Sequence, residues 1–251
     1  MSATIEFRRQ TNISKSSGIA TNLLAYWSME EASGNLLDEL GRCQAAPYSG
    51  NLPTYQQTGK INYSIDFPGT TTGARVNDTS AQTYLNPEGD VYSIQAWVNL
   101  NELPSVSGHV CTILRSSLAA TPWENIVVRI DTDNRVTMRF TGTSDNNYIY
   151  ATVSSISSGV WYHLVFVIAG IDNTPKIYVN GSVTNGSTTQ VGDIYDVSGS
   201  TAGYNIGNAY NGTNIAFNGR IDELAVWRKA LSSDEVIWLY NNGNGRSYSD
   251  F

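Results

Sequence analysis

Asp222 is the residue whose position in the sequence most clearly indicates chemistry. It alternates with Leu224 and Val226 along residues 220–227, and alternation along a strand places such residues on one face. A carboxylate that faces the core needs a cation or several hydrogen-bond donors. Calcium takes oxygens from carboxylates and carbonyls, so Asp222 is a candidate calcium ligand. The alternative is that Asp222 accepts hydrogen bonds from backbone amides.

Aromatic side chains are the second chemical signal. Aromatic rings stack on the apolar faces of pyranose sugars, beside amides that bond the hydroxyls. The candidates for such sugar contacts lie in loop-rich or alternating stretches and are Trp123, Tyr148, Tyr150, Tyr204 and Tyr210. Ordinary packing is the alternative for each of them.

The sequence lacks the patterns of common catalytic sites. No G-x-S-x-G, Walker A or H-E-x-x-H motif occurs. Asp131 and Asp133 share a two-residue spacing but fall in a turn signal, where carboxylates cap backbone amides. His163 falls within an apolar strand pattern, which favours a packed histidine. We therefore expect a protein that is not an enzyme.

The stretches that must position these residues are typical of β-strands. Runs of alternating apolar and polar residues recur between turn signals, as in β-sandwiches. Strands are predicted at residues 22–27, 64–67, 92–100, 111–115, 126–130, 136–140, 148–153, 161–169, 176–179, 204–206 and 220–227. Asn180-Gly181 predicts a tight hairpin, because both central residues of that turn need positive φ.

One helix is predicted, at residues 231–240. Ser232 and Glu235 form a capping-box signal, and Asn241 to Gly243 end the helical pattern. A helix of two turns is marginal alone, so it must dock on the sandwich.

The composition of the chain narrows the classes of partner and location that the sequence allows. The chain has 251 residues, of which 41% are hydrophobic and 15% charged, with a net charge of −7. An acidic surface repels phosphate backbones, so no nucleic acid partner is expected. No apolar run has the length of a membrane span, and the start shows no signal peptide. Cys43 and Cys111 form either one disulfide or two buried thiols.

Four segments stand out by their order along residues 22–243. They are LAYWSMEEASGN at 24–35 with Asp38; IDFPG at 65–69; YSIQAWV at 92–98 with WYHLV at 161–165 and IYVNG at 177–181; and FNGRIDELAVW at 217–227 followed by RKALS and the helix. Together they resemble the laminin-G-like, concanavalin A-like lectin/glucanase jelly-roll family. The resemblance implies an all-β, antiparallel two-sheet sandwich with one short C-terminal helix.

The resemblance also bears on sites. It implies that calcium, if bound at Asp222, takes further oxygens from Glu30 and Gly69, although Pro68 stands where the family's turn usually has Asp. Glycoside hydrolases of this fold carry E-x-D-x-x-E on one strand, where alternation gathers the acids on one face. That pattern is absent from this sequence.

Residues 1–22 are polar and are interpreted as an arm before a single domain at 23–251. Free-standing domains of this kind resemble head-decoration and tail-fibre proteins of bacteriophages. We therefore expect a structural and adhesive component of the virion surface, made in a host cytoplasm. It would bind other virion proteins through the arm, form a homo-oligomer such as a trimer, and display the sandwich toward cell-surface glycans.

Two alternatives remain open. The first is a bacterial, calcium-dependent, lectin-like carbohydrate-binding module. The second, weaker one is a polysaccharide-cleaving enzyme.

Overall fold

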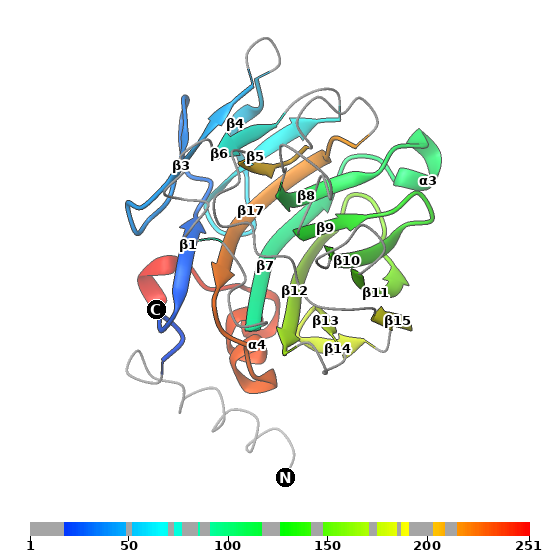
Figure 1. The fold of residues 1–251 in the computed structure, drawn as a ribbon. Helices are drawn as coiled ribbons and strands as arrows, with labels where there is room; N and C mark the ends of the chain where they lie inside the picture. Colours follow the sequence, from blue (N-terminus) through cyan, green and yellow to red (C-terminus); the bar gives the residue numbers. More distant parts are fainter. Residues whose placement is uncertain are drawn as a thin grey trace.

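The fold is a sandwich of two antiparallel sheets (Figure 1). The computed structural model describes residues 18–48, 52–69, 73–76, 85, 91–116, 126–141, 148–170, 175–184, 187–190, 203–208 and 215–251. For residues 140, 141, 148–155 and 187–190 only the backbone is described.

The first sheet has eight strands. Their order is β14 (Ser182–Thr184), β13 (Lys176–Val179), β12 (Trp161–Ala169), β7 (Val91–Leu100), β17 (Asn218–Trp227), β5 (Tyr63–Pro68) and β4 (Thr54–Thr58), and β1 (Leu23–Trp27) also pairs with β17. The long strands β7, β12 and β17 form its centre.

The second sheet has nine strands. Their order is β15 (Ser187–Gln190), β11 (Tyr148–Ser155), β10 (Arg135–Thr141), β9 (Ile126–Ile130), β8 (Cys111–Ser116), β16 (Tyr204–Ile206), β6 (Ala74–Val76), β3 (Gln44–Pro47) and β2 (Leu36–Leu37). The fold class predicted from the sequence is confirmed.

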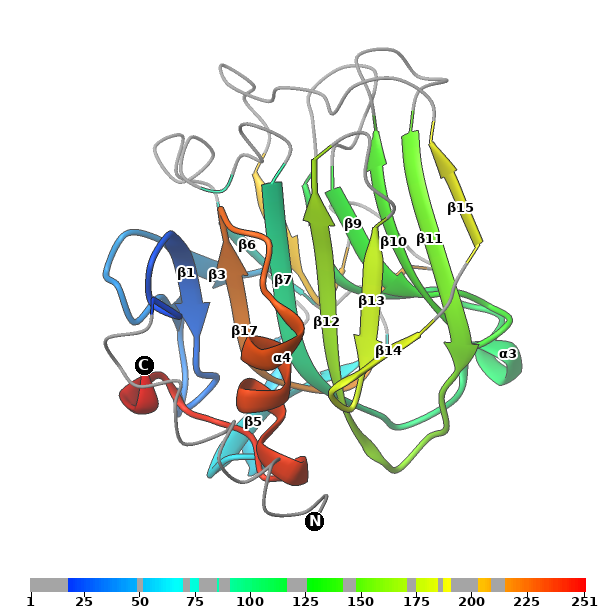
Figure 2. The same ribbon diagram turned by 90° about the horizontal axis from the view of Figure 1, so that it is seen from below.

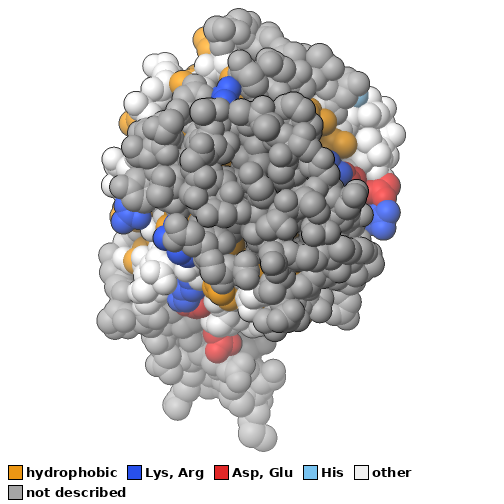
Figure 3. Space-filling model, in the orientation of Figure 1, with side chains coloured by type: hydrophobic (Ala, Val, Ile, Leu, Met, Phe, Trp, Pro, Cys, Tyr) orange, Lys and Arg blue, Asp and Glu red, His pale blue; other side chains and the backbone are white. Residues whose placement is uncertain are grey.

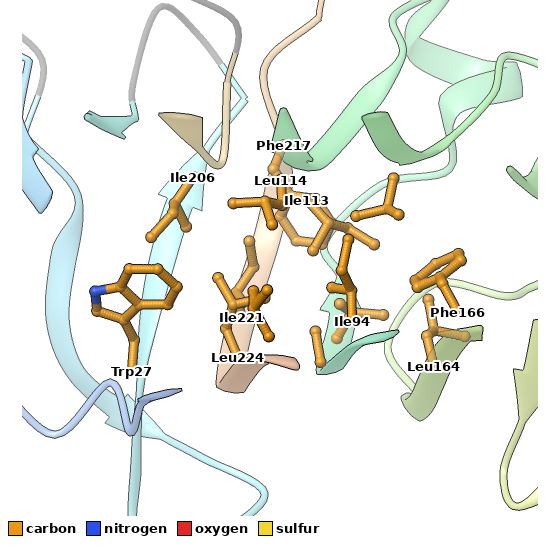
Figure 4. Packing of buried hydrophobic residues seen from close by; sticks show 14 of the residues in the cluster. Trp27, Ile94, Ile113, Leu114, Leu164, Phe166, Ile206, Phe217, Ile221 and Leu224 are labelled. Carbon is orange, nitrogen blue, oxygen red and sulfur yellow. The ribbon is translucent and has the colours of Figure 1, made fainter. Parts of the chain in front are cut away.

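An apolar core fills the space between the sheets. Alternate residues of β7, namely Tyr92, Ile94, Ala96, Val98 and Leu100, all point into it. Figure 4 shows the same packing for side chains of β1, β8, β12, β16 and β17. We call this cluster the inter-sheet core.

A second apolar cluster covers the outer face of the eight-stranded sheet. It lies under helix α4 (Ser233–Tyr240) and the segment that follows, including the 3-10 turns η3 (Asn241–Gly243) and η4 (Tyr248–Asp250) (Figure 2). Its members include Tyr26, Trp227 and Trp238, and the Phe251 ring contacts all three. We call it the outer core, and because of it this sheet is buried on both faces.

The folded part begins earlier than predicted. Ile19 is fully buried in the outer core, and its carbonyl accepts a hydrogen bond from the Trp227 indole at 2.8 Å. Lys229 Nζ donates to the Gly18 carbonyl at 3.0 Å. Residues 18–22 therefore belong to the sandwich and not to an arm, and residues 1–17 lie outside the described residues.

The local signals at α4 and the tight hairpin are confirmed. Ser232 caps α4 and forms a capping box with Glu235. Asn180 and Gly181, between β13 and β14, have φ values of 51° and 77°. A one-turn helix, α3 (Pro104–Ser107), was not predicted.

Candidate functional site

A β-bulge in β17 decides where its carboxylates point. The register between β17 and β7 shifts between Asp222 and Ala225, and Glu223 takes φ 50°. Asp222 pairs with Trp97, whereas Leu224 lies in the inter-sheet core. The prediction that Asp222 shares a face with Leu224 and Val226 is therefore wrong, because the extra residue of a bulge reverses the alternation.

Asp222 is nevertheless fully buried, on the outer side of the sheet. Its Oδ2 accepts hydrogen bonds from the amides of Lys60 and Ile61 at 2.8 and 3.0 Å, as the alternative interpretation predicted. Within the described residues its Oδ1 has no partner. Burial raises the pKa of Asp222 to about 8, against the effect of the two amide bonds.

Glu223 is a second buried acid beside the first. Its carboxylate accepts a very short hydrogen bond from the Tyr26 hydroxyl. Burial, followed by repulsion from Asp222, raises the pKa of Glu223 to about 9. Both carboxyls are therefore largely protonated at neutral pH when no cation is near.

Glu223 also lines a small acidic pocket of about 230 Å³, which we call the acidic pocket. Its walls are Ser28, Glu30, Glu39, Asn62, Glu223, Ser247, Tyr248 and Ser249. This volume lies below the roughly 300–1,000 Å³ of typical small-molecule sites. The pocket therefore suits water or a cation better than a sugar ring.

The structure brings together two of the three residues predicted to bind calcium. Asp222 accepts amide hydrogen bonds from Lys60 and Ile61 in the turn between β4 and β5, and Glu30 accepts one from Tyr63, the residue at which β5 begins after that turn. Their charges also interact, since Glu30 raises the pKa of Asp222.

Gly69 lies elsewhere. Its amide donates a hydrogen bond to the carbonyl of Phe217. Phe217 is five residues before Asp222, a separation of about 16 Å along a strand at about 3.3 Å per residue. Its φ of 73° and its contact with Asn218 explain the glycine instead.

Asp222 and Glu30 together supply part of what a calcium ion requires. The unpartnered Oδ1 of buried Asp222 is an oxygen that a cation would satisfy. No group of three or more His, Cys, Asp or Glu side chains in the described part of the chain is arranged to hold a metal. A calcium ion at Asp222 and Glu30 would therefore take most of its ligands from carbonyls and water.

A second, open pocket of about 580 Å³ lies against the edge of the nine-stranded sheet, beside the bridge between Asp38 and Trp27 of β1. It is lined by Asn35, Leu37, Asp38, Gly41, Arg42, Cys43, Gln44, Ala46 and Arg75. We call it the open pocket. Leu36 and Ala45 point into the inter-sheet core. Their neighbours along the strands therefore lie on the outer face of the sheet, as do the residues that pair with them. These outer residues are Leu37, which pairs with Gln44, and Ala46, which pairs with Arg75.

Hydrogen bonds shape the wall of the open pocket. Asp38 Oδ2 accepts the amide of Arg42 at 3.0 Å and its Oδ1 accepts the amides of Tyr26 and Leu40, so this carboxylate folds the turn. Asn35 Nδ2 donates to Gln44 Oε1 at 3.0 Å. Within the described residues, this bond leaves Gln44 Nε2 and Asn35 Oδ1 to bond a ligand.

Of the five aromatic candidates for sugar contact, the structure describes the side chain of Tyr204. Tyr204 is buried in the inter-sheet core and its hydroxyl donates to the Leu85 carbonyl at 2.9 Å, so the prediction that it contacts a sugar is wrong. The side chains of Tyr148 and Tyr150 in β11 lie outside the described residues, as do Trp123 and Tyr210.

The histidine and cysteine predictions have clear outcomes. His163 is completely buried between Trp97 and Tyr240, and burial lowers its pKa to about 3, so it stays neutral. Cys43 and Cys111 are both thiols. Burial raises the pKa of Cys111 to about 11. Cys43 is half-buried, packs against the inter-sheet core and also lines the open pocket.

Comparison with known proteins identifies the family. A model of the concanavalin A-like lectin/glucanase superfamily, laminin G type, matches residues 68–237. This chain belongs to that family. A search of curated proteins found no match.

Solved structures share the fold. Domain 4 of AbnA, a GH43 extracellular arabinanase from Geobacillus stearothermophilus, in complex with arabinotriose, is 19% identical with a TM-score of 0.59, covering 86% of this chain and 97% of that domain. Trypanosoma rangeli sialidase in complex with sialic acid is 15% identical with a TM-score of 0.64, covering 97% of this chain. The present chain spans only 38% of the sialidase.

Sequence reasoning missed Glu223 and the whole open pocket. The adjacent acids in the segment RIDELAVW were the available signal for Glu223, since a strand with two consecutive buried acids requires a bulge or a cover.

The described ranges contain no helix long and apolar enough to cross a membrane.

The buried acids predict how stability depends on pH. A carboxyl with a folded pKa of about 8 keeps its proton where the unfolded chain has lost it, so the free energy of unfolding falls as pH rises from about 4 to about 8. In chelator, Asp222→Asn should remove part of this fall, at most about 1.4 kcal/mol per pH unit. Urea titrations at several pH values measure it.

The matched control is Asp133→Asn, an exposed turn carboxyl whose pKa is lowered by its bond to Arg135. This variant should keep the wild-type slope between pH 5 and 8. Parallel curves for wild type and Asp222→Asn would contradict the assignment.

Proposed function

We propose that this domain binds glycans without cleaving them. The observation that carries the proposal is its likeness to domain 4 of the arabinanase, along 97% of that domain, in a structure that contains arabinotriose. The sialidase structure also contains a sugar, sialic acid, but the likeness covers only part of that chain. Domain 4 of the arabinanase, which matches over nearly its whole length, is therefore the better guide to the function of this chain.

The open pocket is the site that we propose for the glycan. Its volume falls within the range of small-molecule sites. It offers two amide side chains for hydroxyl groups, and Leu37, which is 54% exposed, for the apolar face of a ring. Carbohydrate sites combine these two kinds of contact.

The absence of catalysis is also part of this proposal. Among the described residues that line the open pocket, Asp38 is the one carboxylate, whereas glycoside hydrolysis uses two across the bond. In the acidic pocket the three glutamates surround a space too small for a sugar ring. These features support binding over cleavage.

A panel of neutral and acidic polysaccharides in affinity electrophoresis tests the function. We expect retardation by at least one polymer and no release of reducing ends. Gln44→Ala should weaken binding about five-fold, because one hydrogen bond is worth about 1 kcal/mol. Gln57→Ala, on strand β4 of the eight-stranded sheet and outside the lining of the pocket, is the control and should bind normally.

Alkylation of Cys43 locates the bound glycan. A ligand in the open pocket should slow maleimide labelling at Cys43, while buried Cys111 stays slow throughout. Binding that leaves labelling of Cys43 unchanged would place the site elsewhere. Release of reducing ends would overturn the non-catalytic part.

We also propose that calcium binds at Asp222 and Glu30 and fastens the β4–β5 turn to β17. The support is the shared turn and the unpartnered Oδ1 of Asp222. Millimolar calcium should raise the melting temperature above that in chelator, by roughly 3 °C for each kcal/mol of binding free energy. Asp222→Asn should abolish this shift, and an equal shift in the variant would refute the site.

We propose, finally, that the chain is a virion surface component that docks through its polar N-terminal residues and assembles as an oligomer. The support is the polar composition of residues 1–17 ahead of the buried Ile19. Deletion of residues 2–17, which spares Ile19, should abolish co-sedimentation with phage particles and leave the melting temperature unchanged. A truncated protein that still co-sediments would refute docking through this segment.

A further inference from the structure

We propose that the open pocket selects sugars that carry a carboxylate, such as uronic or sialic acids. This inference rests on the proposed glycan-binding function and names the ligand class. Two arginines carry it, Arg42 from the β2–β3 hairpin and Arg75 from β6, both in the lining of the pocket. A guanidinium pairs with a carboxylate through two parallel hydrogen bonds, a geometry that a neutral hydroxyl cannot match.

The two arginines come from different elements and are held differently. Arg42 is exposed, and its Nη1 donates to the Leu23 carbonyl at 2.9 Å, which fixes one end of the guanidinium. Arg75 is half-buried and projects from the outer face opposite Ala46. A guanidinium has five N–H donors, so an existing contact leaves capacity for a ligand.

The positive charge continues along the sheet. Arg75 pairs with Asn205 of β16, and Asn205 pairs with Arg115 of β8. Two strand spacings place Arg115 about 10 Å from Arg75, near the Debye length at physiological salt. Figure 3 shows Lys and Arg side chains on the flank that carries β1 and β3 in Figure 1.

Asp38, the one acid among the described lining residues, does not cancel this charge. The Asp38 carboxylate is 5% exposed and accepts three backbone amides, from Tyr26, Leu40 and Arg42. These three bonds commit its oxygens to the turn, and little of the residue is exposed to a ligand. A local excess of arginine on a chain of net charge −7 is the arrangement expected of a site for a small anion.

The amides complete the recognition of a sugar acid. The bonded pair Asn35 and Gln44 lies on the same hairpin as Arg42 and can bond ring hydroxyls while the arginines hold the carboxylate. An inorganic anion would use the arginines alone. This difference separates a sugar acid from sulfate or phosphate as the ligand.

The test compares matched polymers with and without charge. Wild-type protein is titrated with oligogalacturonate and its carboxyl-reduced form, and with sialyllactose and lactose, with sodium sulfate as the anion control. Calorimetry gives affinity and Cys43 alkylation gives occupancy. We expect at least ten-fold tighter binding of one acidic member than of its neutral partner, and weaker binding when salt is raised from 50 to 300 mM.

Variants assign the effect to the pocket. Arg42→Gln and Arg75→Gln should each lose at least ten-fold in affinity, and Arg42→Lys should lose less because the charge remains. Arg135→Gln is the matched control, since it removes an arginine at the exposed start of β10 that pairs with Asp133. Melting temperatures confirm that each variant is folded.

The outcomes are distinguishable. Equal binding of acidic and neutral partners overturns the inference and leaves glycan binding intact. Binding of acidic sugars that is unaffected at Arg42 and Arg75, or that leaves Cys43 unprotected, also overturns it. Sulfate that protects Cys43 from alkylation as strongly as the sugars do would show that the pocket recognises any small anion and not a sugar acid. Failure of every glycan to bind overturns the inference and the proposed function together.

Discussion

The burial of both faces of the eight-stranded sheet is the constraint on which the rest of the structure depends. One face meets the nine-stranded sheet, and the other is apolar enough to require a cover. Helix α4 and the segment up to Phe251 supply that cover, and α4 is too short to be stable without the docking. On this side of the sheet the cover leaves the small acidic pocket, which is below the size of a sugar site. The open pocket instead lies at the edge of the other sheet.

The bulge at Glu223 is the local consequence of that burial. A regular strand would send Asp222 and Leu224 to the same face and place a carboxylate in the inter-sheet core. The bulge turns Asp222 outward, toward the amides of the β4–β5 turn, and Glu223 toward Tyr26. Both acids thus find hydrogen bonds at the boundary between the sheet and its cover. The strand can then return to apolar alternation at Leu224 and Val226.

The sequence allowed most of the long elements to be predicted, because their patterns are local. β7 alternates along its whole length, α4 carries its own capping box, and Asn180-Gly181 has a single favoured turn. The short strands β2, β3, β4 and β6 escaped because polar or few residues form them, as in the TYQQT of β4. Pairing with neighbouring strands determines where these short strands form, and their own residue types do not.

The candidate site was harder to predict for the same reason. The open pocket joins a two-residue strand, a turn and Arg75 of β6, which are brought together only by pairing through β3. Asp222 was correctly predicted to be buried, but for an alternation that the bulge abolishes. Tyr204 looked like a surface aromatic because its strand has only three residues, too few to show which face is inside.

The raised pKa values of Asp222 and Glu223 have a consequence for the charge of the molecule. Without a bound cation both groups are largely neutral at pH 7, so the folded protein carries a smaller negative charge than its formal −7. Unfolding returns both groups to ordinary acidity and releases their protons to the solvent. The unfolded chain is therefore the more strongly anionic form, and unfolded chains repel one another more strongly.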